Sequence, residues 1–421
     1  MPDRAIAPTY RPIGTIEFTD PSVFKLQNGI EVFCFDLADE EVIKIEIITE
    51  GGKWNESKLG VASLAAKLVK EGTQKLTAVE FANAVDFYGG TFQSTAGLHT
   101  AVFTLFSLNK YLPELLPLMK EALTDAAFRE DDLQLAVSQS LQKLAINLEK
   151  VEYCGQRAFL NQLFGDNHPY GSLPNADTYR AVTRADLKDH AQNFLTSNAK
   201  IIVSGKIPAG FNLLLNDTLG TLKLHADLEL KEHVLQPFLS QKHNDDWPKA
   251  QQSAIRVGRQ IVNRNHPDFH ALQVFNTALG GYFGSRLMKN IREDKGYTYG
   301  IYSSLVSMPQ AAYFHISTEV GKQFREETIK EIHHELKRLQ TDLMSEQELS
   351  MVKNNMLGNI LEGIDGPFNL ASTYKSLLPY NLDFGYFYDF IKVIKTITPP
   401  DIQRLASQYF DPAEMTEIVV G

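Results

Sequence analysis

Two histidines, His266 and His270, stand four residues apart in the sequence HPDFH. On a helix this spacing brings two imidazole rings to one face, which is an arrangement that can bind zinc. Pro267 lacks a backbone N–H and has a fixed φ angle, so it favours the first turn of a helix and places His266 at the helix boundary. We therefore interpret His266 as a polar cap and predict that this pair is structural.

The other histidines do not form a cluster with metal-ligand spacing. His333 and His334 are adjacent, and adjacent residues on a helix point in different directions, so we expect them to face solvent or a partner. His99 and His168 are isolated in the sequence, and we interpret both as structural. The histidines therefore predict no metal site in this chain.

The segment LGGYFGSRL (279–287) contains three glycines and invites comparison with a phosphate-binding loop. It lacks the Lys-Ser/Thr pair that holds phosphate and metal, and it follows a predicted helix instead of a strand. We predict that its glycines allow close approach of a helix and a loop. A hydrolase with an unrelated site is also disfavoured, because no Ser/His/Asp or Cys/His arrangement is evident in the sequence.

Arg292 and Tyr299, in IREDKGYTYG, are a different kind of pair. A guanidinium group and a phenol O–H are hydrogen-bond donors that can stabilise a developing oxyanion. A structural alternative is that Arg292 pairs with Glu293 or Asp294 while Tyr299 packs in a strand. The residues alone leave both interpretations open.

The chain contains an internal repeat, and the repeated elements are those that must position the residues described above. Two pairs of segments resemble each other: 128–149 with 344–365, and 183–205 with 398–421. In both pairs the aligned residues are 216 positions apart, as the terminal Gly205 and Gly421 show. The sequence therefore predicts a tandem duplication with a first domain at 1–225, a linker at 226–250 and a second domain at 251–421.

Hydrophobic periodicity predicts strands and helices in both halves. In the first half we expect strands at Val32–Phe35, Val42–Thr49 and Thr100–Ser107, and helices at Leu59–Glu71, Ala78–Tyr88 and Leu112–Thr124. In the second half we expect helices at Pro267–Leu279, Ser285–Glu293 and Glu326–Thr341, and strands at Tyr299–Ser307 and Ala312–Val320. This order predicts an α+β fold with a mostly antiparallel sheet packed with helices in each half.

The composition narrows the function classes. The 421 residues carry a formal net charge of −10, which argues against nucleic acid or an anionic membrane as partner. Cys34 and Cys154 are too few for a disulfide framework, and we expect both to be buried. No segment has about 20 consecutive apolar residues, and the N-terminal residues do not have a signal-peptide pattern. We expect a cytoplasmic protein.

Three segments, 60–97, 163–171 and 279–300, resemble the insulinase/pitrilysin family of zinc peptidases, in particular its small bacterial, processing-peptidase-like branch. The first resembles the segment that carries the inverted zinc motif H-x-x-E-H, and the second a loop that follows the helix with the third ligand. LGGYFGSRLMKNIREDKGYTYG, the third segment, resembles the second-half signature. With the duplication, the likeness spans nearly the whole chain.

The resemblance breaks at the metal site. The two histidine positions of the motif align with Ser63 and Lys67, and the catalytic glutamate aligns with Ala66. The third ligand aligns near Gln142 or Lys143, neither of which is a carboxylate. A hydroxyl is a poor zinc ligand, a methyl group cannot act as a base, and an ammonium group repels a dication. We predict that this chain binds no metal or other cofactor and is not active alone.

The family likeness also assigns a role to Arg292 and Tyr299. In the family, an arginine and a tyrosine at this spacing hold the substrate carbonyl, and in two-chain members one chain supplies zinc while the other supplies this pair. The resemblance therefore implies a non-catalytic subunit of a zinc metallopeptidase heterodimer that binds peptide and completes the site of a homologous zinc-bearing partner. Without that partner, a homodimer is the other assembly.

Two further expectations follow from the resemblance. FQSTAGLHTAVFTLF (92–106) aligns with a strand whose edge can add an extended peptide by backbone pairing, with a core strand as the alternative. The alternative function is a structural or scaffold protein of the same fold, in which Arg292 and Tyr299 have no part in proteolysis.

Overall fold

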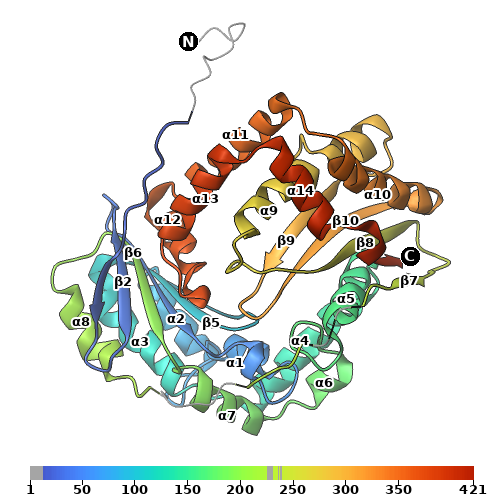
Figure 1. Ribbon diagram of the computed structural model, residues 1–421. Coiled ribbons are helices and arrows are strands. Elements are labelled where there is room, and N and C mark those ends of the chain that lie inside the picture. Colours follow the sequence, from blue (N-terminus) through green and yellow to red (C-terminus); the bar gives the residue numbers. More distant parts are fainter. Residues whose placement is uncertain (1–12, 225–230, 236, 238) are drawn as a thin grey trace, which may run out of the picture.

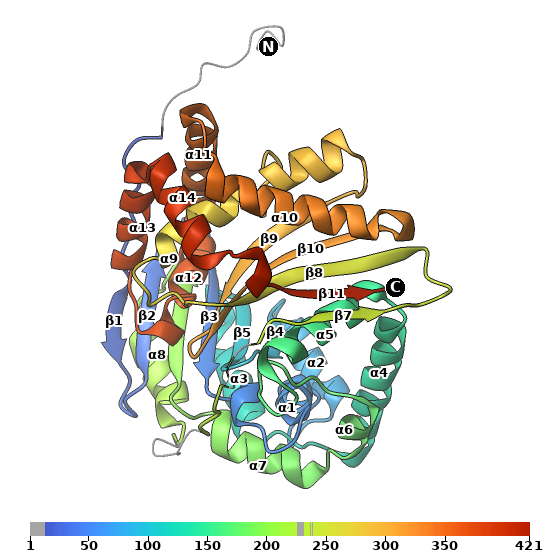
Figure 2. The same cartoon turned by 45° about the vertical axis from the view of Figure 1, so that its right-hand side comes forward.

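The computed structural model describes residues 13–224, 231–235, 237 and 239–421, and it contains two β-sheets with helices packed on them (Figures 1 and 2). The first sheet has six strands in the order β1-β2-β6-β3-β5-β4. They are β1 Ser22–Lys25, β2 Glu31–Asp36, β3 Val42–Thr49, β4 Thr91–Ala96, β5 Ala101–Leu108 and β6 Lys200–Gly205. The second sheet has five strands in the order β7-β11-β8-β10-β9. They are β7 Lys242–Asp245, β8 Gln252–Ile261, β9 Ile301–Ser307, β10 Ala312–Gly321 and β11 Thr416–Val420.

The two sheets share one topology. The order β2-β6-β3-β5-β4 corresponds strand by strand to β7-β11-β8-β10-β9, with β1 as an addition in the first half. In each sheet the strand that comes last in the chain pairs in parallel with the strand that begins this shared order: β6 pairs with β2, and β11 pairs with β7. The other neighbours are antiparallel. The mostly antiparallel α+β fold and the tandem duplication predicted from the sequence are confirmed.

One backbone constraint recurs in both halves. Gly205 and Gly421 end the two corresponding strands with φ angles of 121° and 124°. A Cβ atom on Gly205 would lie 2.2 Å from the Val42 carbonyl oxygen, and one on Gly421 would lie 2.4 Å from that of Gln252. Because both the φ angle and the close approach exclude a side chain, each half needs glycine at this point.

Fourteen α-helices surround the sheets in the described part of the chain. The first half contributes α1 Val61–Leu68, α2 Ala78–Phe87, α3 Leu112–Thr124, α4 Glu130–Leu148, α5 Val151–Phe164, α6 Ala176–Arg180, α7 Arg184–Phe194 and α8 Phe211–Thr218. The second half contributes α9 Phe269–Asn276, α10 Arg325–Thr341, α11 Glu346–Glu362, α12 Gly366–Lys375, α13 Gly385–Thr396 and α14 Pro399–Tyr409. Within the described ranges, none of these helices combines the length and apolar character needed to cross a membrane.

The halves exchange one helix each. Helix α5 belongs to the first half but packs on β8 and β11 of the second sheet, and α12 of the second half packs on β2 and β6 of the first sheet (Figure 1). Aromatic contacts join these surfaces: the Tyr374 ring on α12 lies 5.4 Å from Phe33 and 5.6 Å from Phe35. On the other side, the Phe159 ring on α5 lies 6.1 Å from Tyr313. In each sheet, part of one face is therefore covered by a helix of the other half.

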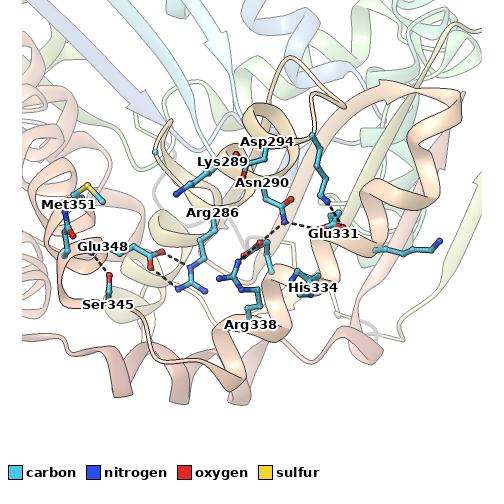
Figure 3. Close-up of a pocket in the computed structure, with 15 residues that line it drawn as sticks. Arg286, Lys289, Asn290, Asp294, Glu331, His334, Arg338, Ser345, Glu348 and Met351 are labelled. Carbon is cyan, nitrogen blue, oxygen red and sulfur yellow. Dashed lines mark hydrogen bonds and ion pairs between the residues drawn. The ribbon is translucent and has the colours of Figure 1, made fainter.

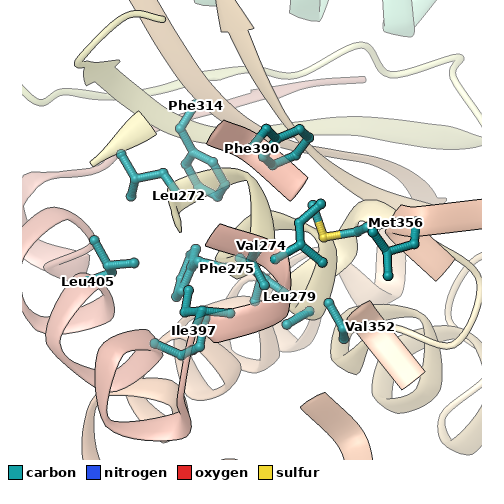
Figure 4. Packing of buried hydrophobic residues seen from close by; sticks show 14 of the residues in the cluster. Leu272, Val274, Phe275, Leu279, Phe314, Val352, Met356, Phe390, Ile397 and Leu405 are labelled. Atoms are coloured by element: carbon teal, nitrogen blue, oxygen red, sulfur yellow. The ribbon is translucent and has the colours of Figure 1, made fainter. Parts of the chain in front are cut away.

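Each half also has its own core. In the first half, buried residues such as Ile45, Leu64 and Leu116 join the sheet to its helices. In the second half, Phe275 stacks on Phe410 with ring centroids 4.1 Å apart, and Phe314 meets the Phe410 ring edge-on at 4.7 Å. Figure 4 shows Phe275 and Phe314 among the buried residues of this core. This second core is continuous with Phe33 and Phe35 of the first sheet, because α12 lies between them.

The structure refines the predicted elements. The segment 92–106 forms a hairpin of β4 and β5 where one strand was expected, because the chain turns between Ala96 and Ala101. The helix expected at Pro267–Leu279 begins at Phe269 and continues as a π-helical segment, Thr277–Gly281. Of the predicted linker 226–250, residues 242–245 form β7, and residues 226–230, 236 and 238 lie outside the described residues.

A buried ion group joins the halves. Glu46 on β3 is 2% exposed, and its carboxylate lies 2.8 Å from the ammonium group of Lys44 and 2.6 Å from that of Lys375 on α12. Breaking a buried ion pair leaves uncompensated charge in a poorly solvated place.

We expect Glu46→Gln to lower the free energy of unfolding by about 3 kcal/mol, measured by urea denaturation. Glu31→Gln removes an exposed partner of Lys25 and should cost less than about 1 kcal/mol. Equal losses in the two variants would contradict a role for the buried group.

Partly buried histidines make stability depend on pH. Burial, with a smaller contribution from Arg256, lowers the pKa of His315 to about 4, and burial beside His168 and His233 lowers the pKa of His99 to about 4. A histidine in the unfolded chain titrates near pH 6.5, so between about pH 6.5 and 4 the unfolded state binds more protons.

The contribution of these histidines to the free energy of unfolding should therefore fall as the pH is lowered through this window, by up to about 1.4 kcal/mol per pH unit for each, while Glu56, whose pKa is raised to about 7, acts in the opposite direction. Urea denaturation at pH 7 and pH 5 measures the loss, and His315→Gln should reduce it. The same substitution at exposed His243 serves as control. An unchanged pH dependence in His315→Gln would refute the assignment.

Candidate functional site

Helix α1, which resembles a zinc-motif helix in sequence, is held at its start by a carboxylate from the preceding loop. Gly60 lies at the N-cap with a φ angle of 100°, so it has no side chain to cap the helix. The Glu56 carboxylate takes this role and accepts hydrogen bonds of 3.0 Å from the backbone N–H groups of Gly60 and Ala62. Burial outweighs these hydrogen bonds and raises the pKa of Glu56 to about 7.

The three degenerate motif positions lie on α1 as the spacing requires, but their contacts are those of a structural helix. The Ser63 hydroxyl is half-buried and donates to the Gly60 carbonyl at 3.0 Å. Ala66 is fully buried, and its carbonyl accepts a 2.6 Å hydrogen bond from Ser94 on β4. Lys67 is half-buried and donates to the Gln139 side chain on α4 at 2.6 Å.

Positive charge gathers where α1 and α4 meet. Partial burial lowers the pKa of Lys67, opposed by Glu71 and reinforced by the ammonium groups of Lys70 and Lys143. Lys143 stands at one of the two positions that align with the third metal ligand, and its charge adds to this lowering of the Lys67 pKa. Two ammonium groups would repel a divalent cation and could not coordinate it. Among the described residues, no group of three or more His, Cys, Asp or Glu side chains could hold a metal ion.

His266, His270 and the cysteines have structural surroundings. The expectation that His333 and His334 both face solvent or a partner is wrong for His333, which is half-buried and lies 2.8 Å from the Glu417 carboxylate, whereas His334 is exposed. The His266 ring accepts a hydrogen bond of 3.1 Å from the Asp268 N–H at the start of α9. His270 packs between aromatic rings of α13, 4.4 Å from Tyr386. Cys34 is a buried free thiol whose pKa burial raises to about 12, whereas Cys154, also free, is only half-buried.

Arg292 and Tyr299 both face away from the core. Arg292 lies on the π-helical segment Met288–Asp294, and its guanidinium is 4.6 Å from the ring centroid of Phe283, which is 59% exposed. Tyr299 precedes β9 and is 92% exposed. Neither residue has the contacts that the structural alternative requires, since Arg292 stacks on an aromatic ring and Tyr299 does not pack in a strand.

The segment that carries Arg292 is fixed from its other side. Residues of Met288–Asp294 line a cavity of about 1070 Å³ shared with α10 and α11 (Figure 3). The Arg286 guanidinium makes a forked pair with Glu348 at 2.7 and 3.0 Å, and the Asn290 amide donates to Glu331 and Glu335 at 3.0 and 2.7 Å. Arg338 and Lys295 also pair with Glu335 and Glu331 in this cavity. Because these ion pairs tie the segment to α10 and α11, we interpret the cavity as the support that positions Arg292.

Two threonines fix the chain at Tyr299. The hydroxyl groups of Thr298 and Thr318 are 3.0 Å apart, and the Gly300 N–H donates to the Thr298 hydroxyl at 3.1 Å. The Thr318 hydroxyl lies 2.9 Å from the Gly300 carbonyl, so the backbone on the C-terminal side of Tyr299 is bound to β10. The phenol is thus presented to solvent from a rigid segment.

Tyr299 lines a small cavity of about 280 Å³ that the sequence did not indicate. Its other charged or aromatic lining residues are Glu152, Arg256, Tyr302 and Glu319. Glu319 could have been suspected, because it continues a series of polar residues at alternate positions of β10. Glu152 and Arg256 come from distant elements and have no local signal.

Sequence comparisons show the family to which the chain belongs. The description "Insulinase (Peptidase family M16)" matches residues 39–166, and "Peptidase M16 inactive domain" matches residues 181–356. The chain belongs to the insulinase family, peptidase family M16, as a member without the H-x-x-E-H motif, and it is a homologue of the inactive-type domains of that family.

Two relatives differ in how they are described. An uncharacterized zinc protease of Mycobacterium tuberculosis is 24% identical over 360 residues, which cover 82% of this chain and 80% of that protein. A non-peptidase homolog of Helicobacter pylori is 25% identical over 328 residues, which cover 73% of this chain and 72% of that protein.

Solved structures share the fold. A peptidase M16 inactive domain from Pseudomonas fluorescens superimposes with a TM-score of 0.86 at 20% identity over 96% of this chain and 98% of that one. The periplasmic protease PqqL of Escherichia coli has a TM-score of 0.78 at 17% identity, and the match covers 99% of this chain but 49% of that one. The E. coli protease is therefore about twice as long.

The charge at the α1–α4 contact can be tested by rebuilding a metal site. Ser63→His with Lys67→His would give two imidazoles on α1, while α4 would still present Lys143. Adding Lys143→Glu should tighten zinc binding by about tenfold or more, because a third ligand replaces a repelling cation. Competition with a chromophoric chelator measures the affinity. Lys143→Gln in the same background removes the charge without supplying a ligand, and equal affinities of the Glu and Gln variants would count against this geometry.

Proposed function

We propose that the chain is the non-catalytic subunit of a two-chain zinc metallopeptidase. It binds the peptide substrate and completes the active site of a homologous, zinc-bearing partner chain. The observation that carries this proposal is the asymmetry between the halves: α1 holds Lys67 where a metal ligand belongs, while Arg292 and Tyr299 are held by rigid supports and directed outward.

Physical chemistry supports a role for the exposed pair. A tyrosine that is 92% exposed contributes little to the core, yet its backbone is fixed by two threonine hydroxyl groups. Fixed donors that need no reorganisation are what stabilisation of an oxyanion requires. The zinc and its activated water would come from the partner, so no step of the hydrolysis is assigned to a metal in this chain.

The size of the chain supports a two-chain assembly. The E. coli periplasmic protease PqqL is about twice as long as this chain, which matches 49% of it. A partner of similar size would supply the missing half as a separate chain. The alternative is a scaffold protein of the same fold, which the H. pylori relative described as a non-peptidase homolog favours.

The first experiment is purification of the tagged chain from its native cells, followed by mass spectrometry of stoichiometric companions. We expect a companion of similar size with an intact H-x-x-E-H motif. Recovery of the chain alone, or in a complex without such a companion, would favour the scaffold.

Within the mixed complex, Arg292→Ala should lower kcat for peptide hydrolysis by about 100-fold or more, because one oxyanion donor is lost. Lys392→Ala removes an exposed cation that does not line the cavity supporting Arg292, and it should leave kcat within about twofold, the scale of a surface substitution. Size-exclusion chromatography should show intact assembly for both variants. An unchanged kcat in Arg292→Ala would eliminate the proposed role.

A further inference from the structure

The cavity beside Tyr299 is built by both halves of the chain. Glu152 comes from the first turn of the exchanged helix α5, whereas Arg256 and Glu319 come from β8 and β10 of the second sheet. Its volume of about 280 Å³ falls just below the range of about 300–1,000 Å³ that suits a drug-sized ligand. The cavity therefore suits one side chain of a longer ligand.

The charges in the cavity do not balance. Arg256 is 4% exposed and is the one cation among the lining residues, while Glu152 and Glu319 supply two carboxylates. Burial and the neighbouring Glu152 raise the pKa of Glu319, although Arg256 opposes them. Two carboxylates that share one guanidinium group lack a second positive charge.

Arg256 also has unused hydrogen-bonding capacity. Its Nη1 donates to the Ile255 carbonyl at 3.0 Å and its Nε to Gln156 at 3.4 Å, but Nη2 lies 3.9 Å from the Glu152 carboxylate, which is too long for a hydrogen bond. This buried group lines the cavity and can donate to a neutral acceptor of a ligand, such as a peptide carbonyl.

Aromatic rings complete the cavity. Tyr302 is 50% exposed and lies directly opposite Ser317 on β10, so it shares a sheet face with Glu319, two residues further along. Its ring also lies against Gly300, where a Cβ atom would be 3.0 Å from it. With Tyr299 it gives the cavity two exposed rings, the kind of surface on which a guanidinium or ammonium group stacks.

We propose that this cavity binds a basic side chain, arginine or lysine, of the peptide substrate. The carboxylates of Glu152 and Glu319 take the charge, the tyrosine rings cover the aliphatic stem, and Arg256 donates to a backbone carbonyl. This inference rests on the proposed function, because it assigns a substrate preference to the surface that carries Tyr299.

The test uses the full chain and three small probes: N-acetyl-arginine amide, N-acetyl-glutamine amide and N-acetyl-glutamate amide. Ligand-observed NMR titration measures each dissociation constant. We expect the arginine probe to bind about tenfold more tightly than the glutamine probe, and the glutamate probe to bind least. Glu152→Gln with Glu319→Gln should abolish the preference for arginine.

A matched control is Glu41→Gln with Glu149→Gln, which removes two exposed carboxylates outside the cavity and should keep the preference. Equal binding of the arginine and glutamine probes, tighter binding of the glutamate probe, or a preference that survives Glu152→Gln with Glu319→Gln would each overturn the inference. Circular dichroism of both double variants checks that they are folded.

The outcome is separable from that of the proposed function. An arginine preference found together with full activity of the Arg292→Ala complex would retain the cation site and reject the role in catalysis. Loss of activity in Arg292→Ala without any arginine preference would retain the completing subunit and reject this cavity as its specificity site.

Discussion

The exchange of α5 and α12 is the constraint on which the rest of the structure depends. Each sheet buries one face against its own helices and part of the other face against a helix of the opposite half. Apolar area removed from water is the main favourable term in folding, at roughly 25 cal/mol per Å². Neither half can gain that term completely without the other, so the two halves form one structure although they arose by duplication.

The same exchange shapes the surface near Tyr299. Because α5 lies on the second sheet, a carboxylate from the first half reaches a cavity whose other charged residues are on β8 and β10. The corresponding position of α12 on the first sheet brings Lys375 to the buried Glu46. One packing arrangement thus gives a structural ion group on one side and an open, charged cavity on the other.

Much of the fold could be predicted from local patterns. The bounds of β3 and α3 agree with the sequence prediction, because a period of two or of 3.6 in apolar residues is visible without knowledge of the partner. β7 was not predicted, since its four exposed residues are ordered by pairing with β11, which lies far away in the sequence. The exchange was not predicted either, because an amphipathic pattern shows that a helix buries one face but does not identify the surface that covers it.

The candidate site, like the fold, could be predicted from the sequence only in part. Ser63, Ala66 and Lys67 could be placed on one helix from their spacing, and the structure adds Gln139 as the hydrogen-bond partner of Lys67. The cavity beside Tyr299 could not be found from the sequence, since its residues converge from four separate elements.

The reciprocal helices also indicate how such a chain could have originated. A single ancestral half would expose one apolar sheet face, and two copies could cover both faces by trading a helix, which is a domain-swapped dimer. Joining the copies in one polypeptide converts that encounter between molecules into an intramolecular step with a high effective concentration. Cutting the chain between the halves would restore the ancestral situation. Each fragment would expose an apolar sheet face and would dimerise with a second copy by the same helix exchange.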